Sequence, residues 1–167
     1  ALIARPHNLG PNPKVNNLVA SYEAARYDTI LISDSHVSVP PEYLMSVAAQ
    51  VKPGVGVITA AVVGINARGV GGILEALYLN TFFLRWMHLL AFVGKACVIG
   101  KSMLFSREVA KRFGGIRVLS RYLAEDYMAG EAMRYLGFKV VLMPAPVFQQ
   151  IGRYRLRDYW LRHVRWG

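Results

Sequence analysis

The tripeptide Asp34-Ser35-His36 carries side chains suited to binding a cation or a diphosphate, and it directly follows a short β-rich run at residues 29–33. A carboxylate at the end of a strand can hold a divalent cation, Mg²⁺ or Mn²⁺, against a diphosphate, because hard cations prefer oxygen ligands. In an extended chain His36 points to the same side as Asp34. It is therefore a second candidate ligand, although imidazole suits Mn²⁺ better than Mg²⁺. The alternative is that Asp34 only caps a loop.

The pair Glu125-Asp126 falls in the first turn of an expected helix. The helix dipole favours acidic residues there, so a structural role is the simpler interpretation of the pair taken alone. The functional alternative is a general base, a carboxylate that removes a proton from an attacking hydroxyl. That role requires the start of the helix to open into a cleft.

The end of the chain reads Arg162-x-x-Arg165-Trp166. Residues three apart lie on one face of a helix, and two guanidinium groups beside an indole can neutralise a departing diphosphate. Arginines alternating with Tyr and Trp over residues 153–160 also suit a helix in a lipid interface or the stacking of RNA bases. The plainest alternative is a solvated basic helix.

Other reactive side chains give weaker signals. Cys97 is the only cysteine, which excludes a disulfide scaffold and makes a zinc cluster improbable. It falls in an apolar run, where we expect a buried, inert thiol. The segment Gly100-Lys101-Ser102 resembles the end of a phosphate-binding loop, but the glycine that such a loop needs five positions earlier is missing.

The elements that must position these residues follow from hydrophobic periodicity and from capping residues. Asn12-Pro13 predicts a helix start with Asn12 as N-cap, and Ser106 and Gly137 are expected to cap two later helices. Strands are expected at 29–33, 55–63, 96–105 and 139–143, and helices at 12–26, 40–51, 73–90, 106–114, 124–136 and 155–166. The glycines at 69, 71 and 72 are expected to break the pattern, and the residues after Pro146 to form a loop.

This order of elements predicts an α/β fold, a mostly parallel or mixed sheet with flanking helices in a single domain. Ligands of open α/β sheets bind beyond the carboxyl ends of the strands, which is where the prediction places Asp34. In the second helix we expect Leu44, Val47, Ala48 and Val51 to lie on one side.

The composition of the chain restricts the kinds of binding partner that we expect. The 167 residues include 20 Lys and Arg against 10 Asp and Glu, a net charge of +10, and 54% are hydrophobic. Such a chain is neither disordered nor collagen-like. The most apolar window, residues 73–99, is interrupted by polar and charged side chains, so a membrane-spanning helix of about 18 apolar residues is not expected. A basic and apolar chain suits an anionic membrane surface or nucleic acid, or is a basic globular protein without a special partner.

The ordered motifs resemble one family. Asn12-Pro13-Lys14-x-Asn16-Asn17-Leu18, Ser33-Asp34-Ser35, the stretch from Gly94 to Ser102, Ala124-Glu125-Asp126-Tyr127 and Arg162-x-x-Arg165-Trp166 follow one another. This order resembles that of the ceramide glucosyltransferase family, membrane-associated inverting glycosyltransferases of the GT-A fold. Many GT-A members have D-x-D where this chain has His36 as the third residue.

The resemblance implies roles for these residues. Asp34 would bind a divalent metal and the nucleotide sugar, with His36 beside it, and Asp126 would be the catalytic base. Arg162, Arg165 and Trp166 would contact the diphosphate and the acceptor, and Lys14, Glu125 and Cys97 would support the site. The implied reaction moves glucose from UDP-glucose to the primary hydroxyl of ceramide, with inversion.

The resemblance also implies a larger protein. Complete members begin with a membrane helix and the nucleotide-binding half of the sheet, and they continue into further membrane helices after the last motif. Residues 1–167 are therefore expected to be the second, C-terminal half of the catalytic domain. We expect it to be membrane-associated and to face the cytoplasm, at the Golgi or ER membrane of a eukaryote or the inner membrane of a bacterium.

Three alternatives to this function stay open. The first is another lipid acceptor, such as a hopanoid. The second is a basic membrane-surface module without catalysis. The third is RNA binding through the Arg-rich end, but the sequence has no RNA-recognition or KH signature, so nucleic acid is not an expected partner.

Overall fold

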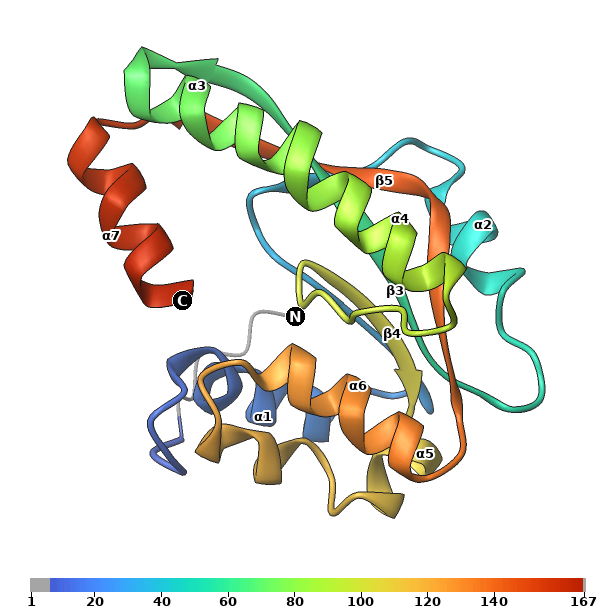
Figure 1. Ribbon diagram of the computed structural model, residues 1–167. Coiled ribbons are helices and arrows are strands. Elements are labelled where there is room, and N and C mark those ends of the chain that lie inside the picture. The colour runs from blue at the N-terminus through green and yellow to red at the C-terminus, as the bar shows by residue number, and fades with distance from the viewer. Residues whose placement is uncertain (1–6, 167) are drawn as a thin grey trace.

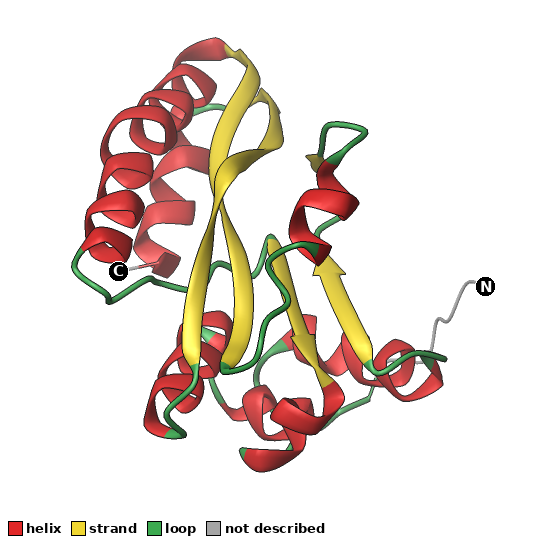
Figure 2. Cartoon of the chain, turned by 90° about the vertical axis from the view of Figure 1, so that its right-hand side faces the viewer, coloured by secondary structure: helices red, strands yellow, loops and turns green. Residues whose placement is uncertain are grey.

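The computed structural model describes residues 7–166, with side chains up to residue 165, and in this part of the chain a five-stranded sheet is flanked by helices on both faces (Figures 1 and 2). The strands are β1 (Thr29–Ser33), β2 (Val37–Ser38), β3 (Val55–Arg68), β4 (Ser102–Ser106) and β5 (Lys139–Arg153). Their order in the sheet is β1-β4-β3-β5-β2. Only β3 and β5 run parallel among these neighbours, and the other pairs are antiparallel. The expected α/β fold is confirmed, in its mixed and not its mostly parallel form.

The helices divide between the two faces of the sheet. They are α1 (Pro13–Ala24), α2 (Tyr43–Ala48), α3 (Gly69–Leu77), the π-helix η1 (Tyr78–Phe83), α4 (Leu84–Phe92), α5 (Arg107–Arg112), the 3-10 helix η2 (Ile116–Arg121), α6 (Glu125–Tyr135) and α7 (Leu156–Trp166). Side chains of α1, α5, η2 and α6 form one buried apolar cluster with β1, β3 and β4. Side chains of α2 and η1 form another with β3 and β5. Neighbouring β3 residues belong to different clusters, Val57 to the first and Ile58 to the second, because successive strand residues point to opposite faces.

Three expected helix caps are confirmed. The Asn12 side chain accepts a hydrogen bond from the backbone N–H of Val15 at the start of α1, and Ser106 caps α5 through Val109 in the same way. Gly137 follows α6 with a φ of +80°, a conformation that favours glycine after a helix.

Strands β3 and β5 are much longer than expected, with 14 and 15 residues. They pair almost to their ends, where Arg68 lies opposite Arg153, and form a twisted ribbon (Figure 2). The predicted loop after Pro146 is therefore wrong. Proline is normally excluded from the interior of a strand because it has no N–H to donate to the neighbouring strand. Here Pro144 and Pro146 lie where the register of β3 with β5 shifts, between the pairs that Ala60 and Val62 form. Such an irregularity in the pairing tolerates residues without a backbone N–H.

Other boundaries also differ from the prediction. The strand expected from residue 96 begins only at Ser102, and residues 95–99 have no regular structure. Gly69 begins the long apolar helix instead of breaking the chain before it, and the helical run α3–η1–α4 continues to Phe92. In α2, Val47 is buried, but Leu44 and Ala48 from the expected common side are exposed, and so is Val51, which lies beyond the end of the helix.

Candidate active site

The antiparallel pairing of β1 with β4 places a lysine beside Asp34. Ser33 lies opposite Ser102 in the register, so Asp34 comes next to Lys101, and the backbone N–H of Asp34 donates to the Lys101 carbonyl at 3.2 Å. The Lys101 Nζ lies 3.4 Å from Asp34 Oδ2 and donates to His36 Nε2 at 2.9 Å. The Lys101 side chain is only 11% exposed, so its charge lies in a site that is largely shielded from water.

Lys14, in the first turn of α1, connects Asp34 to the start of α6. Its Nζ lies 3.3 Å from Asp34 Oδ1 and 3.1 Å from Glu125 Oε1, and it donates to the Gly100 carbonyl at 2.8 Å. Asp34 and the Glu125-Asp126 pair lie about ninety residues apart in the sequence. The Lys14 ammonium group thus connects two of the three candidate motifs predicted from the sequence.

Asn12 and Glu125 hold α1 and α6 together beneath this contact. Asn12 is buried, and its Nδ2 donates to Glu125 Oε2 at 2.9 Å and to the Tyr122 carbonyl at 2.7 Å. Its Oδ1 accepts from Val15 at the same time. Glu125 is also buried. Asn12 contacts one of its carboxylate oxygens and Lys14 the other, so the buried charge is compensated.

The Asp126 carboxylate lies at the start of α6 against the turn at Gly100. Its Oδ2 accepts from the Gly100 N–H and its Oδ1 from the Tyr127 N–H, both at 2.8 Å. A Cβ on Gly100 would lie 2.5 Å from Lys14 Nζ and 3.2 Å from Asp126 Oδ2. Glycine is therefore the residue that lets the turn approach both side chains.

Two polar side chains support the irregular segment before Gly100. The buried Thr59 hydroxyl accepts from the Ile99 N–H at 3.0 Å and lies 3.1 Å from the Ser102 carbonyl. From α6, Arg134 donates to the Ala96 carbonyl at 2.7 Å. These bonds satisfy backbone groups that a strand partner would otherwise satisfy, and they fix the turn that faces Asp126.

Burial and a neighbouring charge shift the pKa of the Asp126 carboxyl group. Burial raises the pKa of Asp126, and the neighbouring Glu125 charge raises it further, against the opposing hydrogen bonds from Gly100 and Tyr127. A raised pKa makes the carboxylate a stronger proton acceptor than an ordinary aspartate, which is the property that a general base needs.

The basic groups are shifted in different directions. Burial alone would lower the pKa of Lys14, but the charges of Glu125 and Asp34 outweigh it, so the pKa is raised. Burial lowers the pKa of Lys101 despite the opposing charge of Asp34. Burial and the Lys101 charge lower the pKa of His36, which favours a neutral imidazole that accepts a hydrogen bond from the Lys101 ammonium.

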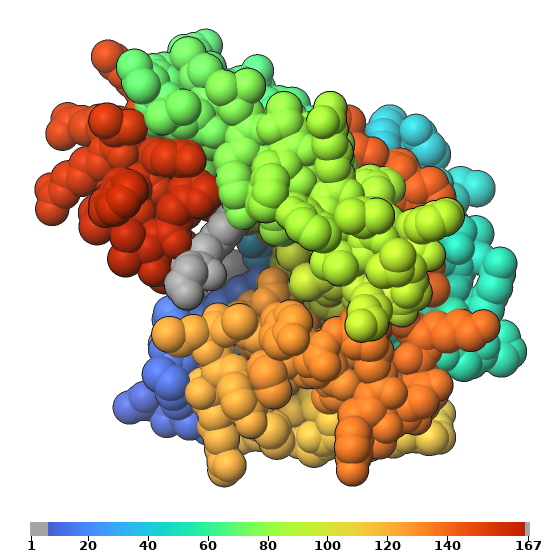
Figure 3. All heavy atoms as spheres, in the orientation of Figure 1, coloured from blue at the N-terminus to red at the C-terminus, as the bar shows by residue number. Residues whose placement is uncertain are grey.

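The third predicted group lies on α7, close enough to act on this cluster electrostatically. The Arg162 charge contributes to the lowered pKa of both His36 and Lys101. Arg162 Nε itself lies 2.8 Å from Glu75 Oε1 on α3, while Arg165 is exposed. The side chain of Trp166, which ends α7, lies outside the described residues. Figure 3 shows α7 at the edge of the molecule, beside α3.

The described residues around Asp34 do not fit a cation site that the protein forms by itself. Each Asp34 oxygen has a lysine ammonium within 3.4 Å, and the imidazole of His36 is bonded to one of those lysines. No group of three or more His, Cys, Asp or Glu side chains that could hold a metal ion occurs within residues 7–165. Two lysines repel a divalent cation at the place where the sequence predicts one.

Cys97 lies near Asp126, and its surroundings favour the protonated thiol over the thiolate. Its thiol is half-buried, and burial together with the Asp126 charge raises its pKa. Since the thiolate is the reactive form, the raised pKa favours the less reactive thiol, as expected, but the side chain is only half-buried and not fully buried.

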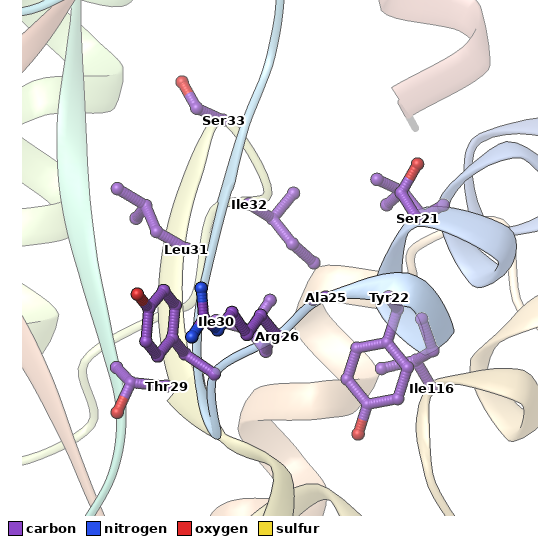
Figure 4. Close-up of a pocket in the computed structure, with 12 residues that line it drawn as sticks. Ser21, Tyr22, Ala25, Arg26, Thr29, Ile30, Leu31, Ile32, Ser33 and Ile116 are labelled. Atoms are coloured by element: carbon purple, nitrogen blue, oxygen red, sulfur yellow. The ribbon is translucent and has the colours of Figure 1, made fainter. Parts of the chain in front are cut away.

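A pocket of about 340 Å³ lies between α1 and β1 (Figure 4). It follows β1 from Thr29 to Ser33, the residue before Asp34, and Tyr22 and Ile116 line its opposite side. The pocket therefore follows the outer strand of the described sheet and ends at Ser33, and the candidate site residues themselves do not line it.

Sequence reasoning missed Lys101 and Glu75. The available signal was the same in both cases, a single charged residue inside an apolar run. Such a residue must find a partner when the run is buried, but the sequence does not show which one.

Comparison with known proteins defines the class of this α/β domain as a glycosyltransferase. The family model described as glycosyl transferase family 21 matches residues 1–167. The chain therefore belongs to this family, as the resemblance implied.

The chain is also similar to named members of curated collections. It is 28% identical over 160 residues to ceramide glucosyltransferase 1 of Caenorhabditis elegans, a match that covers 95% of this chain and 34% of that protein. Ceramide glucosyltransferase 3 of the same organism is 26% identical, with 95% and 35% covered. The ceramide glucosyltransferase of Komagataella phaffii is 28% identical, with 96% and 42% covered. The chain thus spans about a third of the length of the nematode relatives.

The first prediction concerns the cause of the Asp126 pKa. We expect Glu125→Gln to lower the pKa of Asp126, because it removes a neighbouring negative charge and keeps the shape of the side chain. The acidic end of the Asp126 titration then moves to lower pH. Carboxyl ¹³C titration by NMR in the intact protein measures this shift. Glu108→Gln, on the exposed side of α5, is the control and leaves the Asp126 titration where it was. An unchanged or raised Asp126 pKa in Glu125→Gln would contradict the assigned cause.

Proposed function

We propose that the protein containing this chain transfers glucose from UDP-glucose to the primary hydroxyl of ceramide or a similar lipid, with inversion at the sugar. The related proteins are ceramide glucosyltransferases, which supports glucose as the transferred sugar and ceramide as the acceptor. The observation that carries the proposal is the Lys14 ammonium, which joins Asp34 to Glu125, next to Asp126, above the Gly100 turn. It brings a basic carboxylate and several cations to one place.

In this proposal Asp126 is the catalytic base. It takes the proton from the lipid hydroxyl while the hydroxyl oxygen forms a bond to the anomeric carbon. The bond between that carbon and the diphosphate oxygen breaks at the same time, and UDP leaves with the electron pair. The raised pKa of Asp126 supports this assignment, since the carboxylate must hold the proton that it removes.

Cationic side chains stabilise the departing UDP. Lys14 and Lys101 flank Asp34, and Arg162 and Arg165 supply further charge from α7. Positive groups fixed in a shielded site stabilise charge that develops in the transition state more strongly than they would in water. Trp166 contacts the acceptor lipid in this proposal, and His36 orients Lys101 through its 2.9 Å hydrogen bond.

The predicted divalent metal, Mg²⁺ or Mn²⁺, is kept outside these steps, because the residues around Asp34 do not fit it. Transfer measured in a chelator and again after re-addition of Mn²⁺ tests the question. A rate that needs the metal would support the sequence prediction at Asp34. A rate that does not would assign the neutralising role to Lys14 and Lys101.

The base assignment is tested by Asp126→Asn. The amide oxygen can still accept from Gly100, but the group no longer takes a proton, so kcat falls by about 10²–10⁴-fold. Binding of UDP-glucose, measured by calorimetry on the intact protein, stays unchanged. Glu108→Gln serves as the control for a surface charge change. Turnover near the wild-type rate in Asp126→Asn would remove the assignment.

We further propose that the protein meets the membrane surface through one apolar side of the α3–η1–α4 run. Its exposed large side chains recur at helical spacing, at Val70, Ile73, Leu77, Phe82, Trp86, Leu89 and Phe92. Phe92 is 88% exposed. Such a row is typical of a helix lying in a lipid interface, and the net charge of +10 favours anionic headgroups. No helix among the described residues has both the length and the apolar character needed to cross a membrane.

A nitroxide label tests the membrane contact in the intact protein reconstituted into anionic vesicles. A label at position 92 is expected to collide more with lipid-soluble O₂ than with a water-soluble nickel complex. A label at position 135 is the control, because Tyr135 on α6 is equally exposed, at 92%, but lies outside the row. We expect it to collide more with the nickel complex. Equal accessibility at the two positions would contradict this orientation.

The chain is proposed to be the second half of the catalytic domain, with the nucleotide-binding half and the membrane helices outside residues 1–167. Its coverage of about a third of the nematode relatives supports this interpretation. The edge position of β1 supports it as well, because an edge strand offers unpaired backbone groups to a further strand.

A further inference from the structure

A buried ion pair joins α7 to α3. Glu75 lies in α3 and its side chain is 0% exposed. Its Oε1 lies 2.8 Å from Arg162 Nε, and its Oε2 lies 3.1 Å from His163 Nε2. The two oxygens therefore contact neighbouring residues of α7, and the first of these is the arginine that opens the Arg162-x-x-Arg165-Trp166 motif.

Because Glu75 is buried, its carboxylate needs partners that compensate its charge. A carboxylate removed from water costs several kcal/mol unless a cation and further hydrogen bonds compensate for it. Arg162, with 12% of its side chain exposed, and His163, with 23%, supply that compensation from a single turn of α7. Because two atoms of Glu75 bind two successive residues, they restrict both the position and the rotation of α7.

Backbone contacts set the distance between the two helices. A Cβ on Gly71 would lie 2.2 Å from the Arg155 carbonyl oxygen, just before α7, and one on Gly72 would lie 3.0 Å from the Gly152 oxygen. The glycines that look like helix breakers in the sequence therefore let α3 approach the segment that leads into α7. On the other side of the ion pair, the His163 ring packs against Tyr78 and Tyr159, with centroids 4.5 and 4.3 Å away.

The arginine of this ion pair also lies within electrostatic range of the candidate site. The Arg162 charge reaches His36 and Lys101, so this turn of α7 lies on the side of the site. Arg165 follows three residues later and is exposed. A rotation of α7 that released Arg162 from Glu75 would move Arg165 as well, since residues three apart share one helix face.

We propose that Glu75 is a positioning residue for the diphosphate-binding end of α7. It does not touch the substrate. It holds Arg162 and His163 so that Arg165 and the end of the helix face the UDP moiety of the donor. This inference rests on the proposed function, because it assumes that α7 contacts UDP.

The test uses Glu75→Gln in the intact protein, with UDP as the probe. The variant keeps the shape of the side chain and removes its charge. We expect UDP binding, measured by calorimetry, to weaken about tenfold and hydrogen exchange to rise in residues 156–165 but not in α6. Glu108→Gln, which removes an exposed carboxylate paired with Arg112, is the matched control and leaves both measurements unchanged.

A double-mutant cycle separates positioning from a general loss of stability. If Glu75 acts through Arg162, then Glu75→Gln weakens UDP binding by less than about twofold once Arg162→Gln is present. Effects that multiply in the double variant would overturn the proposal, and so would an unchanged UDP affinity in Glu75→Gln. If Glu75→Gln does not fold, His163→Asn replaces it, because His163 lies at the partly exposed margin. Weaker UDP binding at an unchanged melting temperature then supports the proposal, and unchanged binding overturns it. Failure of the wild-type protein to bind UDP would count against the proposed function instead.

Discussion

The candidate site depends on one ammonium group. Lys14 contacts Asp34, Glu125 and the Gly100 carbonyl within 3.3 Å, and these partners come from the end of β1, the start of α6 and the turn before β4. Three negative or partially negative oxygens around one partly buried ammonium lower the cost of removing all of them from water. The contact thus stabilises the packing of α1 against α6 and at the same time gathers the polar groups from which catalysis is proposed.

Charge is distributed unevenly around that contact, and this gives neighbouring side chains different properties. Glu125 has partners for both oxygens in Asn12 and Lys14. Asp126 accepts only backbone N–H groups among the contacts described, and the adjacent charge of Glu125 raises its pKa. The two successive carboxylates therefore differ in their surroundings. Glu125 is paired through both oxygens, and Asp126 is the group proposed to accept the proton. The helix dipole accounts for an acidic pair at this position but not for the difference between its members.

Much of the local structure could be predicted from the sequence. The caps at Asn12 and Ser106 depend only on neighbouring residues, and the apolar run at residues 29–33 was identified without its partner strand. The second half of β5 was missed because this part of the strand exists through its pairing with β3 and β2, which lie far away in the sequence. Lys101 was missed for a related reason, since its partners Asp34 and His36 lie more than sixty residues away in the sequence.

The sequence alone determined the chemical types in the site, their order along the chain and the family to which that order belongs. Only the tertiary structure decided which of them meet. The antiparallel register of β1 and β4 placed Lys101 beside Asp34, and the packing of α7 on α3 paired Arg162 with the buried Glu75. Residue types and local spacing act within a few turns of chain, whereas a register or a helix contact is selected by the burial of two whole elements at once. The partners of a charged residue are therefore fixed by the fold and not by its neighbours in the sequence.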